Sequence, residues 1–445
     1  MFADFSSALS PALLVSLVFG AAVLLHLAVQ LWLASRQIRA VARHRGAVPA
    51  SFAAVMPLAA HQRAADYTVA KLRLGVLEMA VAAAIVLGWT LLGGLDALNA
   101  ALLDALGAGH PLLQPLALLA VFTLVNGLLD LPFSAWQTFG LEARFGFNKT
   151  TPALWLADLL KSAVVGALIG LPLAALVLWL MEAAGPLWWL WTWGVWMGFS
   201  LLMMVLYPTV IAPLFNRFEP LADEALKARV TGLMARCGFA AKGLFVMDGS
   251  RRSSHGNAYF TGFGAAKRVV FYDTLLATLS PDEVEAVLAH ELGHFKRRHI
   301  LKRIALMAVV SLAALALLGW LAQQSWFYAG LGVTPNLPAA LGGGVPNHAL
   351  ALLLFMLAVP VFSFFLSPLM AQLSRRHEFE ADAYAARQTS ARHLSSALVK
   401  LYKDNAATLT PDALYVRFYY SHPPASERIA RMGQAPQALA AGGAA

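Results

Sequence analysis

Long apolar runs alternate with polar segments along this chain. Seven of the runs are long enough to cross a bilayer, which takes about 20 residues in a helix. They lie near residues 10–34, 74–95, 112–133, 162–184, 187–212, 303–323 and 348–370. The fourth and fifth runs are separated only by Gly185 and Pro186, and because their combined length is too great for one span, we expect a helical hairpin. The pattern predicts a mainly α, polytopic membrane protein with seven transmembrane helices.

Two segments are polar enough to fold in water. They cover 213–302 and 371–432, and the sixth and seventh spans at 303–370 separate them. Neither is large enough to fill a core alone, so we expect them to pack together on one side of the membrane. An N-terminal membrane region at 1–212 precedes them. A tail at 433–445, built of small uncharged residues, is predicted to be flexible.

The first polar segment contains recognisable helix and strand patterns. A short strand followed by a turn is predicted at 243–250, and strands enriched in aromatic and β-branched residues are predicted at 257–263 and 268–276, which would form a small β-sheet. Apolar spacing predicts a helix within 221–239. A second helix should run from Pro281 to about His299, because Ser280 is a good N-cap and Glu283 completes a capping box.

Composition and charge support the membrane prediction and indicate an orientation. The chain has 445 residues, of which 59% are hydrophobic and 13% charged, and its net charge is +9. Lys and Arg follow the first, third, fifth and seventh spans, whereas 96–111 and 324–347 contain neither. By the positive-inside rule, the N-terminus is outside and the C-terminus is cytoplasmic. This explains the net charge without a nucleic-acid partner.

The cysteine count and the ratio of Arg to Lys limit the kinds of metal site and the kind of membrane that are expected. The single cysteine, Cys237, excludes an intramolecular disulfide and a cysteine-rich metal cluster. An Ala- and Leu-rich sequence with 23 Arg to 10 Lys suggests a high-GC bacterium, and therefore the bacterial inner membrane.

The stretch HELGH contains candidate metal ligands. His290 and His294 are four residues apart, so both imidazoles project from one face of the predicted helix and can bind one zinc ion. Glu291 could reach a water in the fourth coordination position. Zinc lowers the pKa of such a water to about 7, and a carboxylate can then take its proton. The alternative is a helix end with surface histidines, but the capping box and Gly293 favour zinc.

A catalytic zinc usually has three protein ligands, so a third must come from elsewhere. His299 should point away from the metal face, as part of a solvated basic helix end. The second polar segment opens with SRRHEFEADAYAAR, in which Glu378 and Asp382 share one helical face beside small Ala381 and Ala385. We assign Glu378 to the metal and Asp382 to orienting a ligand histidine.

Two neighbours of Glu378 on the same predicted helix also carry metal-ligand side chains. Glu380 points elsewhere on the helix and is expected to be solvated. His377 is adjacent to Glu378 and faces about 100° away, so it is the less favoured alternative ligand.

Several motifs together resemble the type I CAAX prenyl proteases, which are seven-span membrane zinc metalloproteases. The motifs are HELGH, SRRHEFEAD, the strand pair NAYFTGF and RVVFYDTLL, SHPPASERIARM, and the upstream LPFSAWQTFGLEARFGFNKTT. They occur in the expected order and cover 131–432. The resemblance implies a ring of seven helices around a water-filled chamber with the zinc site inside.

The resemblance also implies roles for individual residues. It places one zinc ion on His290, His294 and Glu378, with Glu291 as the general base. It brings His422, otherwise a loop histidine before a Pro-Pro turn, to the active site, where it could donate a hydrogen bond to the oxyanion.

It further implies a place where a peptide substrate binds. Asn257 and Ala258 resemble the family's edge-strand segment, to which an extended peptide could add as a β-strand. Otherwise Asn257 simply ends a turn. Arg428 is grouped with these two residues as a substrate-binding candidate, and it either ion-pairs near the zinc or faces solvent.

The sequence therefore predicts an integral-membrane zinc endopeptidase. Its substrate is a peptide or protein, prenylated or otherwise membrane-associated, and in a bacterium the cleavage of misfolded or short membrane peptides fits as well as CAAX processing. A transporter or channel is a second class, but Asp130 and Glu78 are too few intramembrane acids for a relay. A catalytically silent scaffold is a third, against which the complete ligand set with Glu291 argues. Both ligand helices lie near span ends, which places the zinc near the cytoplasmic surface.

Overall fold

The computed structural model describes residues 10–107, 112–239, 243–261, 268–338, 340–341 and 346–433. Seven helical segments in this part of the chain are long and apolar enough to cross a membrane, which confirms the predicted number. They are α1 (Pro11–His44), α2 (Leu58–Trp89), Leu113–Glu142, α5 (Pro152–Ala183), Gly185–Phe215, α11 (His299–Leu321) and His348–Gln388. Apart from Gly433, the predicted flexible tail lies outside the described residues.

Three of the seven segments are built from several helical pieces. Proline and π-helical turns interrupt them, which are the usual causes of a bend. The pieces are α4 (Leu113–Ala135) with η2 (Trp136–Glu142); η3 (Gly185–Leu187), α6 (Trp188–Leu206), η4 (Tyr207–Ile211) and α7 (Ala212–Phe215); and α13 (His348–Ser363), η7 (Phe364–Leu366) and α14 (Ser367–Gln388). The predicted hairpin is present, and Gly185 makes its turn with a left-handed backbone, φ 65°.

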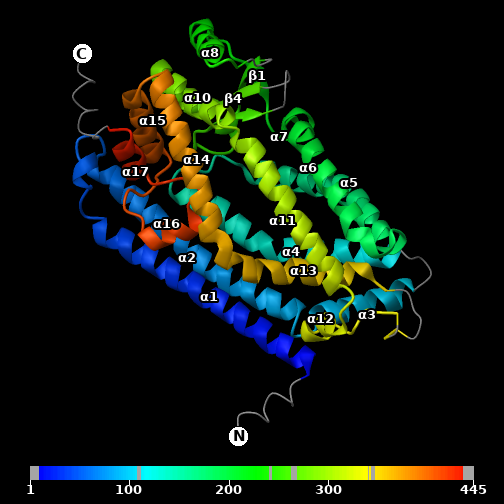
Figure 1. Ribbon diagram of the computed structural model, residues 1–445. Helices are drawn as coiled ribbons and strands as arrows, with labels where there is room; N and C mark the ends of the chain where they lie inside the picture. The colour runs from blue at the N-terminus through cyan, green and yellow to red at the C-terminus, as the bar shows by residue number, and fades with distance from the viewer. Residues whose placement is uncertain are drawn as a thin grey trace.

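The shorter helices gather at the two ends of the long ones. At one end lie α3 (Gly94–Leu106) and α12 (Ser325–Gly330), and at the other lie α8, α10, α15 and α17 with the sheet (Figure 1). The remaining bounds are η1 (Ala50–Phe52), α8 (Glu224–Arg236), η5 (Gly249–Arg251), α9 (Asp273–Thr278), α10 (Pro281–Lys296), α15 (Ala391–Asp404), α16 (Ala413–Tyr419) and α17 (Ala425–Arg431). Separate buried apolar clusters fill the two ends.

Four short strands form one mixed sheet in the order β1-β2-β4-β3. They are β1 (Phe218–Pro220), β2 (Gly243–Met247), β3 (Ala258–Thr261) and β4 (Arg268–Tyr272). The pair β2 and β4 is parallel, and the other two pairs are antiparallel. Because β3 lies at the edge, its outer backbone groups are available to an added strand. The sequence did not predict β1.

The predicted third strand is too long at its C-terminal end. It stops at Tyr272, and the chain turns directly into α9. The side chain of Asp273 accepts hydrogen bonds from the backbone N–H of Ser250 and of Thr274, and such local side-chain bonds compete with a continued strand. The predicted end of the preceding strand, at 262–263, lies outside the described residues.

The helix α10 begins as its sequence predicts and ends earlier. Ser280 and Glu283 form the expected capping box, and the buried Glu283 carboxylate also accepts hydrogen bonds from Ser396 and Lys400 of α15. The helix stops at Lys296 instead of about His299. Arg298 adopts a left-handed backbone, φ 57°, and α11 starts at the next residue. Because of this turn, α11 runs in a different direction from α10, and His299 does not continue the α10 face.

The helices α10 and α14 pack closely against each other. Small residues meet at their crossing, as the sequence predicts: Gly293 of α10 lies against Ala381 of α14, and both are buried. A Cβ atom built on Gly293 would lie 2.9 Å from the Ala381 Cα atom. This close approach brings the side chains of the two helices within reach of one ion.

Candidate metal centre

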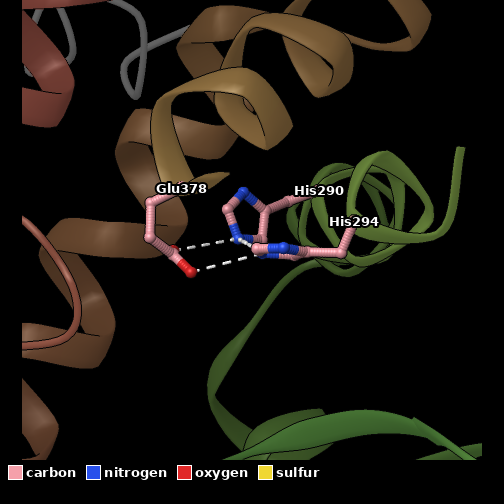
Figure 2. Close-up of side chains that lie close together, drawn as sticks. All are labelled: His290, His294 and Glu378. Atoms are coloured by element: carbon pink, nitrogen blue, oxygen red, sulfur yellow. Dashed lines mark hydrogen bonds and ion pairs between the residues drawn. The ribbon is translucent and has the colours of Figure 1, made fainter. Parts of the chain in front are cut away.

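Three metal-binding side chains meet where α10 crosses α14. His290 and His294 project from one face of α10, and Glu378 reaches toward them from α14 (Figure 2). The two Nε2 atoms are 3.2 Å apart. The carboxylate of Glu378 lies 3.4 Å from the Nε2 atom of His290 and 3.3 Å from that of His294. The structure therefore brings together all three predicted ligands.

This arrangement fits a bound cation. Ligand atoms bound at 2.0–2.1 Å around a tetrahedral zinc are about 3.3–3.4 Å apart, close to the spacings of the three side chains. The Oε2 atom of Glu378 is buried and makes no hydrogen bond to the described residues. The nearest guanidinium, that of Arg428, lies 3.8 Å from this oxygen, which leaves room for a closer cation. Burial lowers the pKa of His290, but Asp382 and Glu378 raise it to about 9, so the site favours positive charge.

The side chain of His290 is braced from behind by a buried ion pair. Its Nδ1 atom lies 2.8 Å from Asp382, which also accepts a hydrogen bond of 2.8 Å from the Nε atom of Arg428. All three side chains are buried. Of the two alternatives for Arg428, the structure shows the ion pair. Asp382 is placed to fix the orientation of the imidazole, as such partners commonly do.

The side chain of His294 is braced differently, by residues that the sequence did not predict. Its Nδ1 atom lies 3.0 Å from the Nδ1 atom of His299, whose Nε2 atom lies 3.1 Å from Glu380. His299 is 2% exposed, so the prediction that it is solvated is wrong. The reason is the turn at Arg298, which starts α11 in a new direction.

The prediction for Glu380 is also wrong in part. Its side chain is 43% exposed, but the carboxylate is engaged with His299. His377 stacks on the His299 ring, with centroids 4.0 Å apart, and is absent from the cluster of ligand-type atoms. One feature of the sequence could have indicated the contact between His299 and Glu380. His299 stands at the start of an apolar span, where an unpaired polar group is costly.

We expect Glu380→Gln to weaken metal binding by about 10-fold or more. An amide accepts a weaker hydrogen bond from His299, which then holds His294 less firmly, and loss of such an outer partner typically costs 10–100-fold in affinity or activity. Competition with a chromophoric zinc chelator measures the effect. Glu219→Gln, an exposed carboxylate on β1, removes the same charge and should leave the affinity unchanged. Equal affinities in the two variants would contradict this role of Glu380.

His422 approaches the cluster from the loop between α16 and α17. Its Nε2 atom is 3.4 Å from Glu378, and its Nδ1 atom is 3.0 Å from the hydroxyl of Ser421. The His422 side chain is 65% exposed, so the ring is open to a molecule that enters the site, and a ring N–H can donate a hydrogen bond to it. Glu291 occupies the helix position after His290 and is partly buried.

Asn257 and Ala258 lie at the start of the edge strand, which packs on α10. The backbone carbonyl of Asn257 accepts a hydrogen bond from Tyr272, so the residue is paired with β4. Within the described structure, neither residue bonds to the cluster around Glu378. The site thus combines a cation position, a carboxylate, a histidine donor and an open strand edge, which together can support peptide hydrolysis.

Known proteins share this arrangement of sequence and fold. One family model, "CAAX prenyl protease N-terminal, five membrane helices", matches residues 37–217, and a second, "Peptidase family M48", matches 220–435. The crystal structure of S. mikatae Ste24p aligns with a TM-score of 0.86 and 28% sequence identity, covering 94% of this chain and 99% of that one.

Similar proteins occur in plants, fungi and animals. CAAX prenyl protease 1 homolog of Oryza sativa subsp. japonica is 38% identical, over 74% of this chain and 76% of its own length. CAAX prenyl protease 1 of Saccharomyces cerevisiae is 36% identical, over 71% of both chains. The Homo sapiens homolog is 32% identical, over 73% of this chain and 74% of its own length.

Proposed function

The chain belongs to the CAAX prenyl protease family of M48 metallopeptidases, so it is a membrane metalloendopeptidase, and we propose that it uses one Zn²⁺ per chain, held by His290, His294 and Glu378. The observation that supports this most directly is the triangle of ligand atoms with sides of 3.2–3.4 Å. Neither a transporter nor a catalytically silent scaffold explains that triangle.

Each residue around the ion would have a separate role in hydrolysis. Zinc, when bound, would polarise the scissile carbonyl and lower the pKa of the attacking water to about 7. Glu291 takes a proton from the water and returns it to the leaving amine. His422 donates a hydrogen bond to the oxyanion as it forms. Asp382, held by Arg428, keeps the His290 ring in its binding orientation.

The substrate would lie along the edge strand β3. An extended peptide can pair with the outer edge of this strand, beside Asn257 and Ala258, which gives affinity with little dependence on side chains. The reaction is then removal of the C-terminal tripeptide from a prenylated CAAX peptide. In a bacterium, cleavage of short or misfolded membrane peptides would use the same residues.

We also propose a location, an orientation and a division of the chain. The protein spans a bacterial inner membrane seven times, with its N-terminus outside and its C-terminus and metal site on the cytoplasmic side. The membrane region 1–212 precedes the segments 213–302 and 371–432, which form one catalytic unit across the spans at 303–370. Contacts between α10 and α14 and a shared buried cluster support this unit.

The test pairs metal content with cleavage. Protein purified in detergent should contain one zinc per chain and should cleave a quenched fluorescent peptide that ends in a farnesylated CAAX box. Removing the metal with a chelator should abolish cleavage, and adding zinc should restore it. Equal cleavage of the unprenylated peptide would favour the quality-control role. Protein without metal, and with no gain from added zinc, would overturn the proposal.

A further inference from the structure

Two cavities lie on either side of a row of hydrogen-bonded polar side chains next to the catalytic unit. Tyr67 donates a hydrogen bond of 2.5 Å to Glu142, which lies 3.7 Å from His255, and the other ring nitrogen of His255 lies 3.1 Å from the side-chain oxygen of Asn405. A cavity of about 420 Å³ opens on the Glu142 and His255 side, and one of about 300 Å³ on the Tyr67 and Asn405 side. Glu142 and His255 line the larger cavity, and Tyr67 and Asn405 line the smaller one.

The two cavities differ in charge. Glu78, Asp130 and Glu142 all line the larger one. The smaller one, which we name the donor cavity, has no Asp or Glu among the described residues of its wall. Its lining residues are Gln37, Tyr67, Thr68, Lys71, Leu72, Tyr402, Asn405, Ala406, Ala407, Thr408, Tyr415 and Tyr420. Glu142 also lies behind Tyr67, a residue in the wall of the donor cavity, but Lys71 offsets its charge there, so an anion is favoured in the donor cavity over the larger one.

Lys71 supplies the positive charge of the donor cavity. Among the described residues it makes no ion pair within 4.0 Å and interacts with the Glu142 carboxylate only at longer range, and its ammonium lies 5.1 Å from the centre of the Tyr67 ring. Burial raises the pKa of Tyr402, Tyr415 and Tyr420. These phenols therefore stay protonated and can donate hydrogen bonds. A carboxylate needs this combination of cation and donors when it leaves water.

The donor cavity lies at the end of the predicted substrate path. The Asn405 side chain accepts a hydrogen bond from the backbone N–H of Gly256, the residue before Asn257. Tyr420 is two residues before His422, so their Cα atoms are within about 8 Å of each other. Three residues of extended peptide span about 10 Å. A peptide lying on β3 with its C-terminus toward Asn257 can therefore place that terminus in the donor cavity.

We propose that the donor cavity binds the C-terminal carboxylate of the peptide substrate, with Lys71 as its counter-ion and the tyrosine hydroxyls as hydrogen-bond donors. This inference rests on the proposed function and adds a basis for its specificity. A fixed carboxylate position sets how many residues lie between the chain end and the metal. The enzyme would thus measure a short C-terminal peptide from its charged end.

The experiment compares two prenylated fluorogenic peptides that differ only at the C-terminus, one a free carboxylate and the other a carboxamide. We expect the wild type to prefer the acid by about 10-fold or more in kcat/KM, the size of one charge-assisted hydrogen bond. Lys71→Met should bring the acid-to-amide ratio close to one, and Lys71→Arg should retain the preference. The free tripeptide product should likewise inhibit K71M about 10-fold more weakly than the wild type.

The matched control is Arg73→Met, which removes a charge from an exposed position on the same helix, outside the cavity wall. It should keep the wild-type ratio. A wild type that cleaves both peptides equally overturns the carboxylate site and leaves the peptidase intact, whereas cleavage of neither peptide overturns the proposed function. If K71M matters only in vesicles of anionic lipid, with an unchanged acid-to-amide ratio, the cavity binds a lipid headgroup and the inference is wrong.

Discussion

Replacing Glu291 with glutamine is expected to lower kcat by about 10²–10⁴-fold and to leave the metal content unchanged. The amide has the shape of the carboxylate but cannot take a proton from the attacking water. Glu291 is not one of the three residues whose ligand atoms meet at the α10–α14 crossing, so its loss removes no metal ligand. The measurement is zinc per chain together with the rate of peptide cleavage.

Glu285→Gln is the matched control on the same helix. Its carboxylate pairs with Arg229 and Arg236, at 2.9 and 2.8 Å, away from the metal site. The two arginines are 40% and 56% exposed and can pair with water instead, and the pairs lie away from the ligand atoms, so activity should stay near that of the wild type. Should E291Q keep a tenth or more of the wild-type rate with zinc bound, another group must be the general base.

Gly293→Ala is expected to remove the metal and to lower the free energy of unfolding by about 1–3 kcal/mol. The added methyl group would lie 2.9 Å from the Ala381 Cα atom and 3.0 Å from the Ala381 carbonyl oxygen, both of them backbone. The helices α10 and α14 must separate to admit it. Glu378 then moves away from His290 and His294, so the ligand triangle opens.

Gly232→Ala shows what the same substitution does without a close neighbour. Gly232 is also inside a helix, α8, and the nearest atom to its added Cβ is the end of the Arg236 side chain at 3.7 Å. Alanine should stabilise this helix by up to about 1 kcal/mol. In detergent, G293A should unfold at a lower temperature than the wild type and should lose its zinc. G232A should unfold at the same or a higher temperature and should keep its zinc. If G293A binds zinc as G232A does, close helix contact does not position the ligands.

Some features of the protein follow from local sequence rules. The seven spans were predictable because bilayer thickness fixes the length of an apolar helix. His290 and His294 were predictable as a pair because their spacing places them on one helix face. The juxtaposition with Glu378 required one more inference, that small residues beside it allow a close helix contact. Metal binding by these residues stays a prediction.

Other features depend on backbone turns that the sequence does not announce. Nothing in KRRH marks Arg298 as left-handed, since glycine or asparagine usually takes that conformation. Without this turn, His299 is placed on the wrong side of the helix, and its contacts with His294 and Glu380 are missed. The donor cavity could not be predicted from the sequence either. Its wall is formed by residues of α1, α2 and two C-terminal segments, which come together only in the folded protein.

The order of the ligands along the chain has a consequence for biosynthesis. His290 and His294 leave the ribosome before the spans α11 and α13, and Glu378 and Asp382 follow only after both. A nascent chain that ends between them has two imidazoles and no third ligand, and Glu291 has no complete metal site to serve. With the proposed ligands, activity would therefore begin only after the last helical pair has entered the bilayer. The newly made protein would then be unable to cut its own unfinished chain.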